Sequence, residues 1–362
     1  MKHKFAQSPF LTPQRYAKTA RNSFEYVPSQ GSKTAKVAMY KIRNYNKSIM
    51  LIIRAKHTKI LSFIIISLLL GKDAYAREID QKKLALNVIS NFDQRVASIS
   101  HKIDIASLEF CSAVAARPGF TIHHLSQYSP PFRSAAQKHF GLDREVRVLA
   151  IASGGPADKA GLKTGDIVEA VDGVRLPVIA AEKNRASTSF SEIVDQKIEA
   201  EFEDGSARLL VKRGAAHKTI LIEAEPGCRN KVSLKPSSKL NAYADGTNVV
   251  LTTGIVSLAK DDAELAAILA HELAHNILGH RAVLDINGRS RRLVRHTEFE
   301  ADRLSIRLLD AAGFSPDAAL RFWRRYGPLQ NSLFSKSRHP PWRSRIKAMA
   351  TEIEALKLEK PN

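Results

Sequence analysis

The chain of 362 residues has only two cysteines, Cys111 and Cys228, and no long apolar segment. Its most apolar run, Ile60–Leu70, has 11 residues, whereas a helix needs about 20 apolar residues to cross the hydrocarbon core of a bilayer. We therefore expect no transmembrane span in the mature protein. Two lone thiols are usually inert in a reducing compartment, but an exported chain can join them in a disulfide. The cysteine count leaves both states open.

Acidic residues are scarce near the N-terminus. Residues 1–76 carry 14 Lys and Arg against 2 Asp and Glu, and they supply most of the formal net charge of +20. The rest of the chain has 42 basic against 34 acidic residues, an excess of 8. So small an excess, with no basic helix, argues against a nucleic acid as partner.

The basic N-terminal part includes the pattern of an export signal. Three basic residues precede Ile60–Leu70, and the small-x-small sequence Ala74-Tyr75-Ala76 follows it. This order is typical of a secretory signal peptide. We interpret residues 50–76, starting at Met50, as that signal and residues 1–49 as an upstream extension that is not normally translated. The alternative is an organellar transit peptide, because residues 1–49 hold ten Lys or Arg and one acid. The first interpretation predicts a periplasmic or envelope-associated protein.

Residues 77–139 are expected to form an N-terminal helical region. Ile99, Ile103, Ala106 and Phe110 follow one another at steps of four, three and four, which is the apolar stripe of an amphipathic helix. We expect this stripe to pack on the C-terminal domain.

Residues 140–226 have a different sequence pattern, with strands in place of a long helix. "VRVLAI", "IVEAVDG", "ARLLVKRG" and "KTILIEAE" predict strands, and "DKAGLKTGD" predicts a short helix ended by glycine, as in a small α+β barrel. The order V-x-V-x-x-I-x-x-x-G-P-A-x-x-A-G-L-x-x-G-D-I-V-x-x-V-D-G resembles a PDZ domain of the bacterial HtrA type. That resemblance makes "HFGL", His139–Leu142, the loop that binds a peptide C-terminus. An ordinary connector is the alternative.

A predicted helix, Asp262–Leu278, contains the sequence "HELAH". Asp261 is a good N-cap, Gly279 is a good stop, and the helix has no Lys or Arg, so it should be buried nearly all round. Three ionisable groups buried within five residues, His271, Glu272 and His275, need a common partner.

A metal ion meets that need. His275 lies about 40° round the helix from His271, one turn on, so both imidazoles can bind one ion, and Glu272 beside them can reach a water molecule. This is the H-E-x-x-H pattern of zinc hydrolases. The alternative is a pair of hydrogen-bonded core histidines. On a continued helix, His280 would lie about 160° round the axis from the direction midway between His271 and His275, so it is not expected to bind the ion.

The third ligand is expected in "EFEAD". Glu298 and Asp302 are four residues apart on a predicted helix, where two like charges repel each other unless a cation lies opposite. A zinc ion bound by Glu298, with Asp302 accepting the N–H of a ligand imidazole, satisfies both carboxylates. The alternative is a solvated acidic face balanced by Arg295 and Arg303, and Glu300 is expected at the surface.

"HELAH" followed by "EFEAD" resembles metallopeptidase family forty-eight, the gluzincins that include the CAAX prenyl endopeptidase and HtpX-like proteases. The resemblance implies one Zn²⁺ per chain, with His271, His275 and Glu298 as ligands. It also implies that Glu272 is the general base and that Asp302 supports a ligand. The expected fold is α+β, with a mostly helical zincin-like domain and a small edge sheet at residues 227–362, plus the PDZ-like β-barrel.

Two more segments fit that family. "HPPWRSRI" resembles its H-P-x-x-x-x-R-I pattern, which implies that His339 faces the site as an oxyanion stabiliser or gate and that Arg345 lies nearby. A helix-leading His-Pro is the alternative for His339. "NAYADG", Asn241–Gly246, resembles the edge strand along which an extended substrate lies. If the PDZ-like segment is an insertion, Cys111 and Cys228 lie near its junctions and a disulfide would staple it to the core.

These patterns predict a zinc metalloendopeptidase that acts on exported proteins. Its substrates would be proteins or peptides, with C-termini binding to the PDZ-like domain, in quality control of the envelope. The alternative is a non-catalytic chaperone or adaptor that bears the PDZ-like domain and keeps a structural zinc. Four protein ligands would close a structural site, and His339 could supply the fourth.

Overall fold

The computed structural model describes residues 78–178, 188–330 and 338–359. The predicted upstream extension and signal peptide, residues 1–49 and 50–76, lie outside this part. Across the described ranges, no helix combines the length and apolar character needed to cross a membrane. Both helices and strands contribute substantially, as the expected α+β class requires.

The described chain begins with a long helix, residues 78–106. Ile99 and Ile103 on this helix are buried in one hydrophobic cluster with residues of the C-terminal helices. The side chain of Gln94 binds both backbone polar groups of Ile151. The helix therefore contacts the C-terminal core through its apolar stripe and the PDZ-like sheet through Gln94.

That sheet is antiparallel, with the order β2-β3-β4-β6-β7 and with β5 paired to β4. Its strands are β2 (Phe120–His123), β3 (Val146–Ile151), β4 (Ile167–Val171), β5 (Val174–Arg175), β6 (Ser206–Arg213) and β7 (Ala216–Glu223). The expected barrel was wrong, because the outer strands β2 and β7 are not paired within the described residues. Helix α4 (Thr188–Glu201) covers the apolar face instead, with Val194 and Ile198 in the core beneath it.

Two further details of this region differ from expectation. β2 precedes residue 140, so the sheet begins inside the region that was predicted to be helical. The proposed carboxylate loop "HFGL" is the end of α2 (Pro130–Phe140), followed by Gly141 at φ 66°. His139 and Phe140 are helical and Leu142 is buried, so this segment is no open loop of N–H groups. The remaining short elements here are η2 (Leu125–Gln127) and α3 (Pro156–Lys159).

A two-stranded ribbon stands where the chain enters and leaves the PDZ-like sheet. It pairs β1 (Val114–Arg117) with β8 (Glu225–Cys228), and η1 (Leu108–Phe110) precedes it. Cys111 and Cys228 form a disulfide, with Cα atoms 5.7 Å apart. Asp104, at the end of the long helix, contacts Arg117 in β1 (2.6 Å) and Asn230 just after β8 (3.1 Å). The disulfide thus lies at the junction where a staple was expected.

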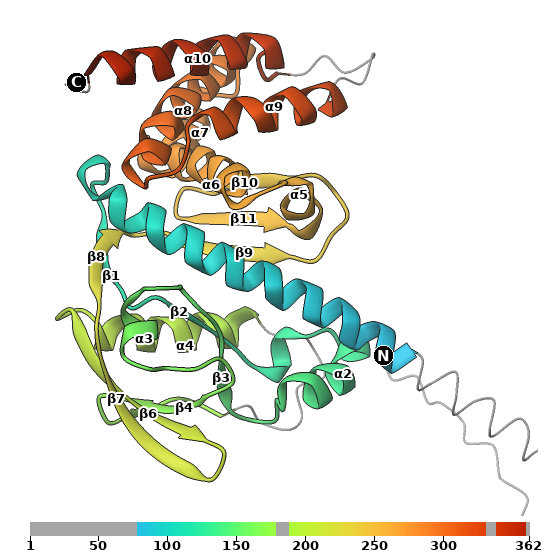
Figure 1. Ribbon diagram of the computed structural model, residues 1–362, viewed down its shortest axis with the longest axis vertical. Coiled ribbons are helices and arrows are strands. Elements are labelled where there is room, and N and C mark those ends of the chain that lie inside the picture. Colours follow the sequence, from blue (N-terminus) through green and yellow to red (C-terminus); the bar gives the residue numbers. More distant parts are fainter. Residues whose placement is uncertain (1–77, 179–187, 331–337, 360–362) are drawn as a thin grey trace, which may run out of the picture. The chain divides into compact units, whose positions relative to one another are not determined.

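The C-terminal region combines a small sheet with helices (Figure 1). The sheet order is β10-β11-β9, with β11 antiparallel to β10 and parallel to β9. Its elements are β9 (Lys231–Lys235), β10 (Ala242–Ala244), β11 (Asn248–Thr252), α5 (Thr253–Leu258), α6 (Asp262–Ile277), α7 (His280–Asn287), α8 (Arg291–Ala311), α9 (Asp317–Gln330) and α10 (Trp342–Glu359).

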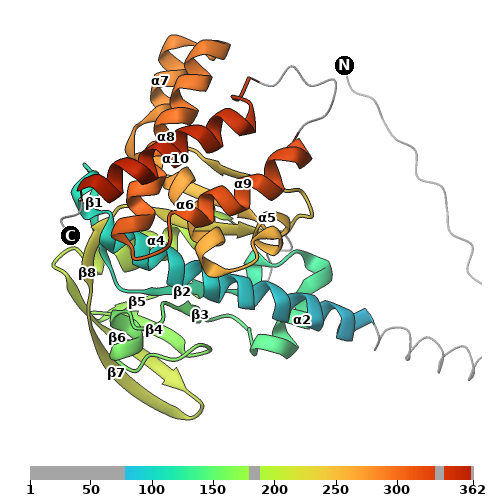
Figure 2. The same cartoon turned by 45° about the horizontal axis from the view of Figure 1, so that its top comes forward.

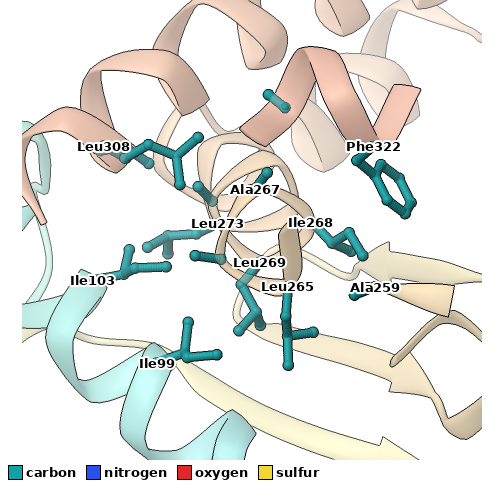
Figure 3. Close-up of a cluster of buried hydrophobic side chains, with 14 of the residues drawn as sticks. Ile99, Ile103, Ala259, Leu265, Ala267, Ile268, Leu269, Leu273, Leu308 and Phe322 are labelled. Carbon is teal, nitrogen blue, oxygen red and sulfur yellow. The ribbon is translucent and has the colours of Figure 1, made fainter. Parts of the chain in front are cut away.

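Helix α6 is the centre of this core, and both of its ends were predicted. Asp261 caps it by accepting a hydrogen bond from the backbone N–H of Glu264 (2.8 Å), and Gly279 follows it at φ 62°. Figure 3 shows apolar side chains of α6 surrounded on several sides by the long N-terminal helix, α8 and α9. Apolar enclosure on that scale fixes the helix rigidly and makes any charged group on it dependent on a partner.

Candidate metal centre

Two imidazoles converge on one side of α6. His271 and His275 are one turn apart, and their Nε2 atoms are 3.2 Å from each other. Both side chains are largely buried, with exposed fractions of 13% and 15%. The predicted juxtaposition follows from helix periodicity alone.

Helix α8 brings a carboxylate to the same point. Glu298 Oε2 is 3.6 Å from His271 Nε2, and Glu298 Oε1 is 3.6 Å from His275 Nε2. All three residues offer ligand atoms that lie within 4.8 Å of one another. Ligands at about 2.0–2.1 Å from a tetrahedral zinc ion are separated by roughly 3.3 Å, so a zinc ion fits this spacing. The sequence-predicted ligand set is therefore assembled from two helices.

Asp302 and Arg345 stand behind these ligands. Asp302 Oδ1 is 3.2 Å from His271 Nδ1, and the fully buried Asp302 carboxylate is held by Arg345 at 2.6 and 2.8 Å. Arg345 also contacts Glu298 Oε2 at 2.9 Å and lies 3.0 Å from His271 Nε2. The alternative of a solvated acidic face is wrong, because both carboxylates are buried and a guanidinium from α10 contacts them.

The charge balance suits a divalent cation. Glu272, Glu298 and Asp302 are three carboxyl groups, and Arg345 is their positive neighbour. With the imidazoles neutral, as metal ligands must be, full ionisation leaves two excess negative charges. Burial alone raises the pKa of Glu298, but the charge of Arg345 and hydrogen bonds from histidines hold that pKa well below its usual value.

In the absence of an ion, the two histidines differ in proton affinity. Burial, then the neighbouring His271, lower the pKa of His275 to about 3. Burial and Arg345 act to lower the pKa of His271, but its contacts with Asp302 and Glu298 raise it to about 9. The ion would therefore compete with a proton on His271, while His275 is already neutral.

Glu272 lies beside the ligands on the same helix. Burial raises its pKa, and the charge of His271 partly offsets this effect. A carboxylate with a raised pKa is a better proton acceptor, which is what a general base requires.

His339 lies at the outer side of the site. Its Nδ1 is 3.0 Å from Glu298 Oε1, and its side chain is 58% exposed. The structure thus places it on a ligand carboxylate, and its predicted role as oxyanion stabiliser or gate stays a prediction.

The sequence interpretation missed His280. The left-handed Gly279 ends α6, so the chain turns and α7 begins beside α8 (Figure 2). His280 is 3% exposed, and its Nδ1 lies 2.8 Å from His275 Nδ1. Glu300, expected at the surface, contacts His280 Nε2 at 3.4 Å and His296 Nδ1 at 2.8 Å. The predicted glycine stop was the available signal, because it invalidates an angle measured on a continued helix.

The edge of the small sheet lies next to α6. β10 is an outer strand of that sheet, and the backbone N–H of Gly246 after it donates to Asn276 Oδ1 on α6 (2.8 Å). Tyr243 in β10 is 42% exposed. The segment expected to be an edge strand is therefore one, and it is tied to α6.

Two histidines one turn apart on α6, a glutamate from α8 and a neighbouring carboxylate have the residue types and the spacing of a single-metal site of the His-His-Glu class. Comparison with known proteins agrees: residues 216–289 and 283–353 match the model of peptidase family M48, and residues 147–182 match a PDZ domain. The C-terminal part of the chain is thus similar to peptidase family M48, and the segment before it is similar to a PDZ domain.

A curated relative is the mitochondrial metalloendopeptidase OMA1 of Schizosaccharomyces pombe. It is 31% identical over 140 residues, which cover 30% of this chain and 42% of that protein. The match thus spans less than half of the relative's length.

Proposed function

We propose that this protein is a zinc-dependent metalloendopeptidase that hydrolyses peptide bonds of exported proteins. The observation that supports this most is the convergence of His271, His275 and Glu298 with Glu272 beside them. Three protein ligands with one position left open are typical of catalytic zinc, whereas structural zinc has four. The cluster found among the described residues has three members, which favours the enzyme over the adaptor with a structural zinc.

A bound zinc ion supplies Lewis acidity, which polarises the scissile carbonyl and lowers the pKa of a water molecule. Glu272 takes the proton of the attacking water and delivers it to the leaving amine. Asp302 accepts the Nδ1 hydrogen of His271 and so keeps its Nε2 free for the ion. Arg345 keeps Glu298 and Asp302 ionised.

Protein and peptide substrates are supported by two binding surfaces. An extended chain can add to the outer strand β10 as a further β-strand, next to α6. The PDZ domain can select partners, including exposed C-termini, by the same kind of strand addition. Quality control of envelope proteins is the role that we propose for the pair.

Export is supported by the pattern of residues 50–76 and by the disulfide. Disulfides persist in oxidising compartments and are rare in the cytosol. We therefore propose a periplasmic or envelope-associated location, which secretion of the full chain with cleavage after Ala76 would test.

The central experiment compares the parent chain with Glu272→Gln. We expect one zinc per chain in both, casein cleavage by the parent that a chelator abolishes and zinc restores, and no cleavage by the variant. Glu354 on α10 is exposed and lies outside the ligand set, so Glu354→Gln serves as the matched control. Cleavage by Glu272→Gln at the parent rate would exclude Glu272 as the base.

A further inference from the structure

We propose that His280 and Glu300 form a two-step hydrogen-bond chain that fixes the tautomer and orientation of the ligand His275. This inference rests on the proposed metal site and deepens it, because it assigns positioning roles to two residues outside the ligand set.

The geometry comes from the turn at Gly279. A φ of 62° is one that glycine adopts without strain, and it lets α7 start immediately after α6. His280 is thereby folded back against His275 and is buried, with Nδ1 facing Nδ1 at 2.8 Å. The other ring nitrogen, Nε2, faces Glu300 Oε2 on α8 at 3.4 Å.

The tautomers follow from the atoms that face each other. A neutral imidazole carries one hydrogen, so one of the two facing Nδ1 atoms donates and the other accepts. The Nε2 atom of His275 points at His271 and Glu298, so it must be free of hydrogen to bind an ion there. His275 therefore carries its hydrogen on Nδ1 and donates it to His280. His280 then carries its hydrogen on Nε2, where Glu300 accepts it.

The opposite assignment does not support metal binding. If His280 donated from Nδ1, His275 would carry its hydrogen on Nε2, and that hydrogen would occupy the ligand position. Glu300 disfavours this state, because an ionised carboxylate can only accept a hydrogen bond and therefore needs the hydrogen of His280 on Nε2. Metal affinity should therefore depend on His280 and Glu300 although neither is a ligand.

Each of the two ligand histidines therefore has a carboxylate that holds its non-ligand nitrogen, directly or through another residue. His271 has a carboxylate directly behind it, Asp302 at 3.2 Å, and His275 has one behind it through His280. Such partners of ligand imidazoles change metal affinity by about 10–100-fold when they are removed. His296, 65% exposed, contacts Glu300 from the solvent side and should contribute little.

The test measures zinc affinity of purified chains by competition with a chromophoric chelator. His280→Leu removes both hydrogen bonds and should weaken zinc binding about 10–100-fold. His280→Asn places an amide oxygen where Nδ1 was, so it should recover most of that affinity. Glu300→Gln keeps an acceptor without the charge and should fall between the parent and His280→Leu. His296→Ala is the matched control and should bind zinc as the parent does.

A second readout separates orientation from mere packing. In the cobalt-substituted chains, the visible absorption of His280→Leu should shift in energy and intensity, while that of His280→Asn should resemble the parent. Thermal unfolding of the metal-free chains checks that each variant is folded. Parent-like zinc affinity in a folded His280→Leu chain, or equal losses in the Leu and Asn variants, would overturn the proposal.

This result is distinguishable from failure of the proposed function. A parent chain that binds zinc through His280-dependent geometry but cleaves no substrate contradicts the peptidase and supports the inference. A parent chain that binds no zinc overturns both.

Discussion

Arg345 and Asp302 meet at two points inside the protein: Nε lies 2.8 Å from Oδ2, and Nη2 lies 2.6 Å from Oδ1. Two parallel contacts of this kind fix the plane of both groups. The guanidinium also lies 3.9 Å from the centre of the Trp323 ring, which holds it from the other side. A residue near the C-terminus thus determines the orientation of the carboxylate behind His271.

Replacing Arg345 by leucine should destabilise the metal-free protein by about 3–5 kcal/mol, because it removes the guanidinium that contacts the buried carboxylates of Asp302 and Glu298. Urea unfolding measures this loss. Arg281→Leu removes an exposed ion pair with Asp285 and should cost less than about 1 kcal/mol. Equal losses in the two variants would contradict the importance of the buried pair.

Replacing Asp302 by asparagine should weaken zinc binding about 10–100-fold, because the neutral amide holds the Nδ1 hydrogen of His271 less strongly. Chelator competition gives the affinity. Asp285→Asn changes an exposed carboxylate on α7 and is the control. If both variants bind zinc as the parent does, Asp302 does not support His271.

Removing the Cys111–Cys228 disulfide by a double change to alanine should lower the free energy of unfolding by about 2–5 kcal/mol. The reason is that the bond closes a sequence separation of 117 residues. A reductant should destabilise the parent similarly and leave the double variant unchanged. A parent chain with two titratable thiols after purification from an oxidising compartment would show that the bond does not form.

Asp93 should make stability depend on pH. Burial raises its pKa from 3.8 to about 7, so between these values the folded chain holds a proton that the unfolded chain releases. The contribution of Asp93 to stability therefore falls as pH rises from 3.8 to 7 and stays low above. Asp93→Asn should be more stable than the parent by about 1–4 kcal/mol at pH 8 and equal to it near pH 4. Chemical unfolding at both pH values tests this, and exposed Asp80→Asn should show no such gain.

The sequence predicted those parts of the site that depend on one helix at a time. The spacing of His271 and His275, the cap at Asp261 and the common face of Glu298 and Asp302 all follow from 3.6 residues per turn and local hydrogen bonds. The family motif added the pairing of the two helices, which periodicity cannot give.

Two predictions failed, and both concerned how an element is joined to or packed against its neighbours. The resemblance to a PDZ domain made "HFGL" a loop, but the helix before it continues to Phe140, and Gly141 supplies its left-handed end. The sequence predicted strands in the PDZ-like domain correctly. It could not predict whether the sheet closes into a barrel, because closure depends on how the outer strands pair and not on the sequence of any one strand. Helix α4 covers the core face, so no pairing between β2 and β7 is needed to bury it.

The amino-acid order by itself determined which side chains of the site share a helix face, because a helix places residues four apart side by side whatever surrounds it. Only the tertiary structure decided which histidine each supporting residue contacts: Asp302 and Arg345 lie beside His271, and His280 lies beside His275 with Glu300 beyond it. These contacts join α6, α7, α8 and α10, and their geometry is fixed by burial of the apolar core rather than by spacing along the chain.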